Sequence, residues 1–178
     1  MICDKLKLNF NEVIRLASTK WNFINFSPGL VGGHCLPVDP YYLTYIAKKR
    51  GYNSKVTLSG RDVNDYMKKH VINFANFAIR SSRIEKNKIK ICVIGLTYKY
   101  GVADTRNSQK IKILKYFKRK FKNTRGFDPF LKKSDILKKH ELKKYNFFIF
   151  LSKGPKFKKI ADLVNKKKII DPFFYYSN

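Results

Sequence analysis

Long apolar runs are missing from this 178-residue chain. The longest covers residues 147–151, whereas a helix that crosses a bilayer needs about 20 apolar residues. The opening residues, MICDKLKLNF, carry charges where a secretory signal peptide requires an apolar stretch. The sequence therefore predicts neither a membrane span nor an exported protein, and we expect a cytoplasmic location.

Cysteine is also scarce, with Cys3, Cys35 and Cys92 as its three positions. None of them forms the C-x-x-C spacing of a metal site, and an odd number of thiols does not suit a disulfide framework. His70 has no second ligand at metal-binding spacing, so we interpret it as a structural histidine. We expect reduced thiols and no bound metal.

Acidic residues are few, because 12 Asp and Glu stand against 39 Lys and Arg, which gives a net charge of +27. Such a charge suits nucleic acid, but it also attracts small anionic ligands. The basic residues are spread along the chain, and the abundance of Lys, Asn, Ile, Phe and Tyr is typical of AT-rich coding sequence. We therefore do not expect a nucleic-acid partner. This alternative requires basic residues gathered on one face and binding that weakens steeply with salt.

A dinucleotide-binding fingerprint is missing too. No G-x-G-x-x-G follows a predicted strand, and the spacing from Gly95 to Gly101 fits neither that fingerprint nor a phosphate-binding P-loop. A nicotinamide cofactor therefore has no binding domain of its own in this sequence.

What the chain does contain is a loop rich in glycine and proline, residues 27–42 (SPGLVGGHCLPVDPYY). Gly32 and Gly33 allow the backbone to approach a ligand closely. Asp39 and Pro40 predict a helix start, because Asp can cap free N–H groups and Pro suits the first helical position. A thiol near the positive end of a helix ionises more easily, and the thiolate is the nucleophile. Cys35 is thus a candidate nucleophile, although a lone cysteine is more often a small buried hydrophobe.

The first half of the chain predicts helices around this loop. Residues 1–8 resemble the end of a helix, Asn9 with Glu12 resembles a capping box, and residues 41–50 form a helix that ends at Gly51. A longer helix is predicted to begin near Arg61. Its apolar stripe consists of Val63, Met67, Val71, Phe74, Ala75 and Ala78. We expect residues 1–84 to form part of a helical domain.

The pattern changes after the polar run 81–90, which we interpret as a linker. Strands are predicted at 90–95, 125–128, 147–151 and 168–171, and helices after Ser108 and at 155–164. This alternation predicts a small Rossmann-like parallel sheet with helices on both faces, which binds ligands beyond the carboxyl ends of its strands. The expected fold class is α/β, with a partial all-helical domain (1–84) followed by a parallel-sheet domain (85–178).

Two blocks of sequence resemble one enzyme family. PGLVGGHCLPVDPYYLTYIA resembles the active-site loop of the UDP-glucose/GDP-mannose dehydrogenase superfamily, and most closely that of its UDP-N-acetylhexosamine 6-dehydrogenases. GLTYK at 95–99 with DTRNS at 104–108 resembles the loop that opens the family's UDP-binding domain. The resemblance covers nearly the whole chain but only the latter half of the family's length. It implies that the NAD-binding domain, and a helix whose lysine and asparagine assist catalysis, would precede residue 1.

The resemblance implies NAD-dependent oxidation of C6 of a UDP-N-acetylhexosamine to the uronic acid, for surface polysaccharide biosynthesis. Cys35 would add to the intermediate aldehyde, giving a thiohemiacetal and then a thioester. Asp39 would position or activate the hydrolytic water, or would only cap its helix. Three positions depart from the family pattern: Ser27 and Pro172-Phe173 replace basic residues, and Pro37 replaces a common glycine.

The same resemblance assigns the remaining site residues. Gly32 and Gly33 would shape the substrate loop, Tyr98 and Lys99 would contact the nucleotide-sugar, and Arg106 would reach NAD. Lys99 and Arg106 could instead be solvated loop charges. Because the family associates through its central helices, we expect a homodimer or a partner chain that carries the NAD-binding domain.

Besides the nucleic-acid-binding protein, two alternatives remain at this point. The first is a non-catalytic remnant that binds nucleotide-sugar or assembles with another chain. The second is a cysteine hydrolase that uses the neighbours His34 and Cys35. Side chains of neighbours in an extended loop point to opposite sides, so we expect His34 to be badly placed to accept the Cys35 proton.

Overall fold

The computed structural model describes residues 1–132 and 136–176. The predicted second domain, 85–178, thus includes five residues that lie outside the described part of the chain. The helices are α1 Ile2–Leu6, α2 Phe10–Ala17, α3 Asp39–Lys49, α4 Lys55–Ser81, α5 Gln109–Lys120 and α6 Pro155–Ala161. The strands are β1 Lys90–Ile94, β2 Asn123–Phe127, β3 Phe147–Phe150 and β4 Ile169–Ile170. Short 3-10 helices are η1 Lys86–Lys88, η2 Lys139–Lys144 and η3 Lys166–Lys168.

The four strands form one parallel sheet in the order β2-β1-β3-β4. This confirms the predicted α/β class with a small parallel sheet. The chain moves from β1 outward to β2 on one side, and from β3 outward to β4 on the other. The order therefore reverses between β1 and β3, and ligands of doubly wound sheets bind beside the carboxyl ends of strands at such a point.

Both faces of the sheet are covered, which is why β1, β3 and β4 are almost continuously apolar. One face is covered by α4 and α5, with Val71, Ala75, Ile113 and Phe117 packed around Ile91 and Val93. The opposite face is covered by α6 and η2, with Phe157, Ile160 and Leu142 packed around Cys92 and Ile94. Alternate residues of β1 thus enter two separate apolar clusters.

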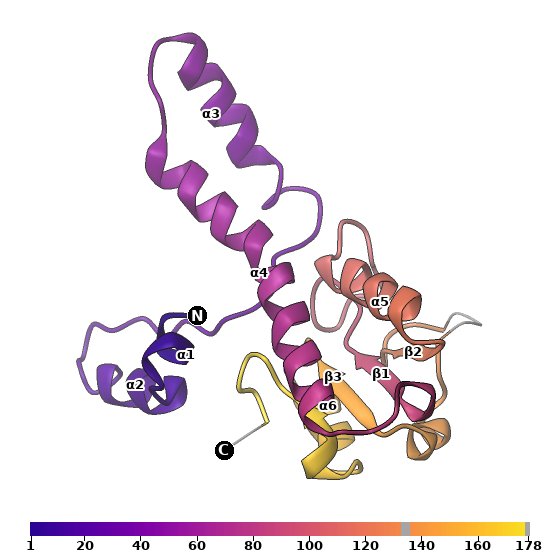
Figure 1. The fold of residues 1–178 in the computed structure, drawn as a ribbon. Coiled ribbons are helices and arrows are strands. Elements are labelled where there is room, and N and C mark those ends of the chain that lie inside the picture. The colour runs from indigo at the N-terminus through magenta and orange to yellow at the C-terminus, as the bar shows by residue number, and fades with distance from the viewer. Residues whose placement is uncertain (133–135, 177–178) are drawn as a thin grey trace.

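Helix α4 links the two halves of the chain. It begins at Lys55, so the prediction that it starts near Arg61 is wrong, and Gly60 lies inside the helix. Its later residues Val71, Ala75 and Ile79 belong to the sheet's core, whereas Val63 is half exposed. In Figure 1 the first part of α4 and α3 project from the sheet as a helical hairpin, while the rest of α4 lies along it. The domain boundary near residue 84 stays a prediction. Helix α4 precedes that boundary, yet it contributes side chains to the core of the sheet that follows it.

Of the three residues expected at helix starts, one caps its helix through its side chain and two do not. Asn9 caps α2 as expected, since its side chain accepts hydrogen bonds from the N–H groups of Asn11 and Glu12. Asp39 is the first helical residue of α3 and not its cap, because the chain turns into the helix one residue earlier, at Val38. The Ser108 residue does precede α5, but its hydroxyl donates to the carbonyl of Leu96 instead of accepting from the helix.

Helix α1 contacts α4 through an aspartate and a histidine. His70 Nε2 lies 3.3 Å from Asp4 Oδ2, and burial lowers the pKa of His70.

Among residues 1–132 and 136–176, no helix combines the length and apolar character that crossing a bilayer demands.

Two glycines allow a direct test of the packing at the strand ends. Gly95 has φ +85°, and a Cβ there would lie 2.5 Å from Ser152 Oγ. We expect Gly95→Ala to lower the free energy of unfolding by about 2 kcal/mol, because overpacking and backbone strain add. Gly60→Ala is the matched control, since nothing lies within 4 Å of that Cβ position and alanine favours a helix by up to about 1 kcal/mol. Urea unfolding measures both, and equal effects of the two substitutions would contradict this packing.

Candidate functional site

The glycine-rich loop lies directly against the loop that follows β1. A Cβ on Gly32 would come within 3.1 Å of the Tyr98 Cβ and of the Asn107 carbonyl oxygen. A Cβ on Gly33 would come within 3.2 Å of the Tyr98 ring. Only glycine permits this approach without displacement, so the structure brings together three residues singled out from the sequence.

The glycine-rich loop is also anchored from α4 and from the C-terminal segment. Asn64 Oδ1 accepts from the Val31 N–H at 3.2 Å, and Arg61 Nη1 donates to the Leu36 carbonyl at 3.3 Å. The Tyr175 hydroxyl donates to the Pro28 carbonyl, and Lys153 Nζ bonds Ser27 Oγ. Sequence reasoning missed these anchors. Their only local signal was a pair of polar residues three apart within the long helix.

The Cys35 side chain is exposed. Its carbonyl accepts from the N–H groups of Val38 and Asp39, both at 2.8 Å, so the cysteine sits in the turn that leads into α3. A thiol in this position lies near the positive end of an eleven-residue helix, as the sequence predicts.

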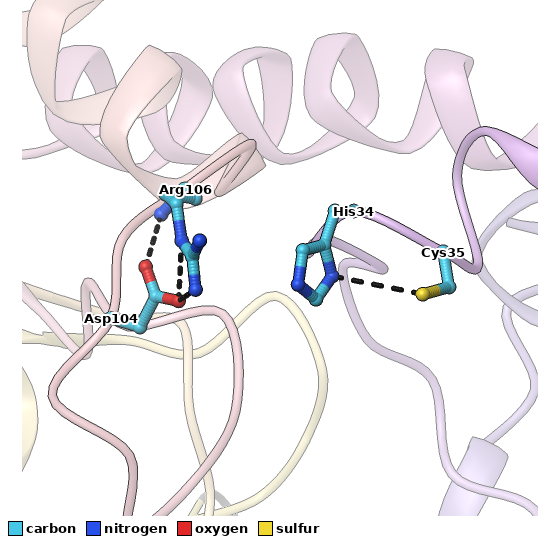
Figure 2. Close-up of polar contacts among 4 residues, drawn as sticks. All are labelled: His34, Cys35, Asp104 and Arg106. Atoms are coloured by element: carbon cyan, nitrogen blue, oxygen red, sulfur yellow. Dashed lines mark hydrogen bonds and ion pairs between the residues drawn. The ribbon is translucent and has the colours of Figure 1, made fainter.

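The Cys35 thiol contacts the neighbouring imidazole, with 3.7 Å between Cys35 Sγ and His34 Nδ1 (Figure 2). The expectation that these two side chains diverge is therefore wrong. It assumed an extended backbone, whereas Gly33 has φ +92° and the chain bends at this point. The Asp39 carboxylate is exposed in the first turn of α3, and the structure shows no contact between it and Cys35 in the described part of the chain.

Arg106 is held by an acid on its own loop. Its Nε and Nη2 lie 2.9 and 2.8 Å from Asp104 Oδ2, and its backbone N–H donates to Asp104 Oδ1 at 2.8 Å. The hydrogen bonds from Arg106 lower the pKa of Asp104, and nearby His34 lowers it further. The Arg106 side chain is 71% exposed, and Lys99 on the same loop is exposed as well, beside the partly buried Tyr98.

A buried polar network fixes the loop after β1. Asp128 Oδ2 accepts from the N–H groups of Leu96 and Thr97, at 2.7 and 3.0 Å, and from the Thr97 hydroxyl. Lys110 Nζ donates to the Thr97 carbonyl at 2.9 Å and to Ser152 Oγ at 2.7 Å. The network joins the carboxyl ends of β1, β2 and β3, and it positions the Tyr98 and Lys99 segment. Sequence reasoning missed Lys110, and it placed Asp128 only at the end of the predicted strand 125–128.

The loop after β1 does not fit a dinucleotide. In dinucleotide folds the glycine-rich loop presents free backbone N–H groups to a pyrophosphate. Here the N–H groups of Leu96 and Thr97 donate to Asp128, and the Cβ position of Gly95 is filled by Ser152. In the described segments, no group of three His, Cys, Asp or Glu side chains could hold a metal ion.

Comparison with known proteins agrees with this geometry. Residues 1–66 match the central domain of the UDP-glucose/GDP-mannose dehydrogenase family, and residues 92–177 match its UDP-binding domain. The chain belongs to this family. The two matched regions contain, respectively, the cysteine loop and the loop after β1, which the fold brings into contact.

Among relatives of this family member, Protein CapL of Staphylococcus aureus is 43% identical over 118 residues, which are 66% of this chain and 28% of CapL. The UDP-N-acetyl-D-glucosamine 6-dehydrogenase of Pseudomonas aeruginosa is 36% identical over 77% of this chain and 32% of its own length. The solved UDP-D-ManNAc dehydrogenase of Pyrococcus horikoshii aligns with 94% of this chain and 40% of that chain, at a TM-score of 0.77 and 28% identity. The chain thus spans about a third of the length of these curated relatives.

The buried Lys110 ammonium should make stability depend on pH. Burial lowers its pKa to about 8, against the opposing effect of Asp128, whereas an unfolded lysine titrates near 10.4. Between these values the unfolded chain binds more protons, so deprotonation favours the folded state and the free energy of unfolding from this group rises with pH, by at most about 3 kcal/mol. Urea unfolding at pH 7.5 and 9.5 measures the rise. Lys110→Met should remove that part of the pH dependence, and the exposed Lys112→Met on the same helix should keep it. An identical pH dependence in both variants would contradict the assignment.

Proposed function

We propose that this chain is the central and UDP-binding part of an NAD-dependent UDP-N-acetylhexosamine 6-dehydrogenase, which oxidises C6 of the sugar to a carboxylate for surface polysaccharide biosynthesis. The observation that carries the proposal is the contact of the Gly32–Gly33 backbone with Tyr98. This contact supports a site in which the exposed thiol of Cys35, two residues further along the loop, reaches a ligand bound at the sheet of the UDP-binding domain. The relatives named as UDP-N-acetyl-D-glucosamine 6-dehydrogenases support the substrate class.

In this proposal the nucleotide-sugar lies along the edge where β1 and β3 end. Tyr98 and Lys99 contact it, with the exposed Lys99 ammonium serving as a point charge for phosphate. Gly32 and Gly33 shape the other wall, because their bare backbone leaves room next to the Tyr98 ring. The net charge of +27 favours the approach of a dianionic diphosphate.

Cys35 acts on the aldehyde formed by the first oxidation. Its thiolate adds to the carbonyl carbon, and the carbonyl oxygen takes a proton to give a thiohemiacetal. Oxidation of that adduct gives a thioester, and water then releases the carboxylate and the free thiol. Asp39, one helical turn along the chain, positions or activates that water. Its exposed carboxylate is compatible with this role.

NAD supplies the hydride acceptor of both oxidations, and we propose that a separate NAD-binding domain holds it. The described residues give no dinucleotide cradle, since Asp128 occupies the backbone N–H groups of the loop after β1. Arg106 is proposed to reach the cofactor from this chain. Its exposed guanidinium is already oriented by Asp104.

An additional protein surface is proposed to cover the N-terminal half, either a second copy of the chain or the partner that carries the NAD-binding domain. Large apolar side chains are exposed there beyond what an isolated domain usually shows. The most exposed are Ile2, Trp21, Phe26, Val56 and Phe77.

The decisive assay follows NADH formation from NAD and UDP-N-acetylglucosamine or UDP-N-acetylgalactosamine. We expect the purified chain alone to give no turnover, and the chain mixed with a polypeptide that supplies an NAD-binding domain to give turnover. Turnover by the chain alone would refute the need for a separate domain. No turnover in the mixture, with no UDP-sugar binding by calorimetry, would instead identify a non-catalytic remnant.

Cys35→Ser should stop carboxylate formation in the complemented reaction, with a loss of about a thousandfold or more, because a hydroxyl is a far weaker nucleophile at neutral pH. UDP-sugar affinity measured by calorimetry should stay within about twofold, since Cys35 is exposed and contributes no core packing. Cys3→Ser is the matched control and should retain the parental rate. Unchanged carboxylate formation in Cys35→Ser would remove this residue from the mechanism.

A further inference from the structure

We propose that His34 is a catalytic residue, the base that accepts the proton of the Cys35 thiol. The proposal rests on the proposed function in one respect, that Cys35 is the nucleophile. It adds a proton acceptor that the sequence argument had set aside, and it is carried by the position of the two side chains.

The loop bends so that the imidazole and the thiol meet. Gly33 has φ +92°, a conformation that side chains disfavour, and its Cβ position is closed by the Tyr98 ring. The bend places His34 Nδ1 3.7 Å from Cys35 Sγ, within reach of an S–H···N hydrogen bond. Tyr98 and the backbone turn from Cys35 to Asp39 hold the bend from either side.

A second observation concerns the far side of the imidazole. Figure 2 shows the His34 ring between Cys35 and the Asp104–Arg106 pair. The ring is close enough to lower the pKa of Asp104 electrostatically, and the two hydrogen bonds from Arg106 lower it more strongly. The Asp104 carboxylate therefore stays ionised, and it stabilises the imidazolium that forms when His34 takes the proton.

The step is a simple proton transfer. The proton moves from Cys35 Sγ to His34 Nδ1, no oxidation state changes, and a thiolate and an imidazolium result. Nδ1 must be the unprotonated nitrogen, with the hydrogen on Nε2. The transfer starts from a neutral imidazole and a protonated thiol, and it leaves both groups charged.

The test measures thiol reactivity, and it needs neither UDP-sugar nor NAD. Iodoacetamide alkylation of Cys35 is followed by mass spectrometry from pH 5.5 to 9.5 in a Cys3→Ser background, because Cys3 is partly exposed. Cys92 is fully buried and serves as an internal report of folding. The groups that face the reacting pair are Asp104, Arg106 and Tyr98.

We expect the parental profile to rise well below the ordinary thiol pKa of about 8.5, and His34→Gln to move it back toward that value. At pH 7 the alkylation rate should fall about fivefold or more, since fewer thiols are ionised. Asp104→Asn should produce a smaller shift in the same direction. His140→Gln is the matched control, because His140 is exposed on η2 and contacts neither residue.

Superimposable profiles of the parent and His34→Gln, with Cys92 protected in both, would overturn the proposal. A parental profile centred near pH 8.5 would overturn it without any variant, which covers the case in which His34→Gln fails to fold. The outcome is separable from that of the proposed function. His34-dependent alkylation without turnover in the complemented assay would support the proton transfer from Cys35 to His34 and refute the dehydrogenase activity. Cys35-dependent turnover with His34-independent alkylation would refute the proton transfer and support the dehydrogenase activity.

Discussion

The candidate site depends on the contact between the bare backbone of Gly32 and Gly33 and the side chain of Tyr98. It is the point where a loop from the first half of the sequence meets a loop from the sheet. Hydrogen bonds from Asn64 and Arg61 on α4 hold the same loop from behind, and α4 itself packs on the sheet through Val71. The position of Cys35 is therefore fixed relative to the strand ends by the core and not by the loop alone.

The other side of the site is organised by one buried carboxylate. Asp128 accepts three hydrogen bonds from Leu96 and Thr97. Lys110 donates hydrogen bonds both to Thr97 and to Ser152, which follows the neighbouring strand β3. Satisfied buried polar groups of this kind are costly to disrupt, so the loop after β1 has one well-defined shape. This network also limits what the backbone of the loop can bind. Backbone N–H groups that would bind a phosphate in a dinucleotide fold already donate to Asp128, so our proposal assigns recognition of the nucleotide-sugar to the side chains of Tyr98 and Lys99.

Local patterns were enough to predict the parallel sheet and most elements. Strands β1 and β3 are short apolar runs buried on both faces, and Asn9 is a cap whose partners lie two and three residues away. Local rules failed where the backbone is irregular or where distant residues meet. The divergence expected of His34 and Cys35 applies to extended chain, and Gly33 is not extended. In the sequence Lys110 resembles any other helix lysine, because its hydrogen-bond partner Ser152, just after β3, lies 42 residues away.

The contacts within this chain also show which parts of the candidate site are positioned without a ligand. Contacts within the described residues orient the thiol, the Tyr98 ring and the Asp104–Arg106 pair without any ligand. Preorganisation of this kind would lower the ordering cost of the nucleotide-sugar binding that we propose. Within the described residues the loop after β1 offers a dinucleotide no such arrangement, because Asp128 already accepts from its backbone N–H groups. In the proposed reaction these residues thus handle the sugar and its covalent adduct, and a separate NAD-binding domain holds the group that receives the hydride.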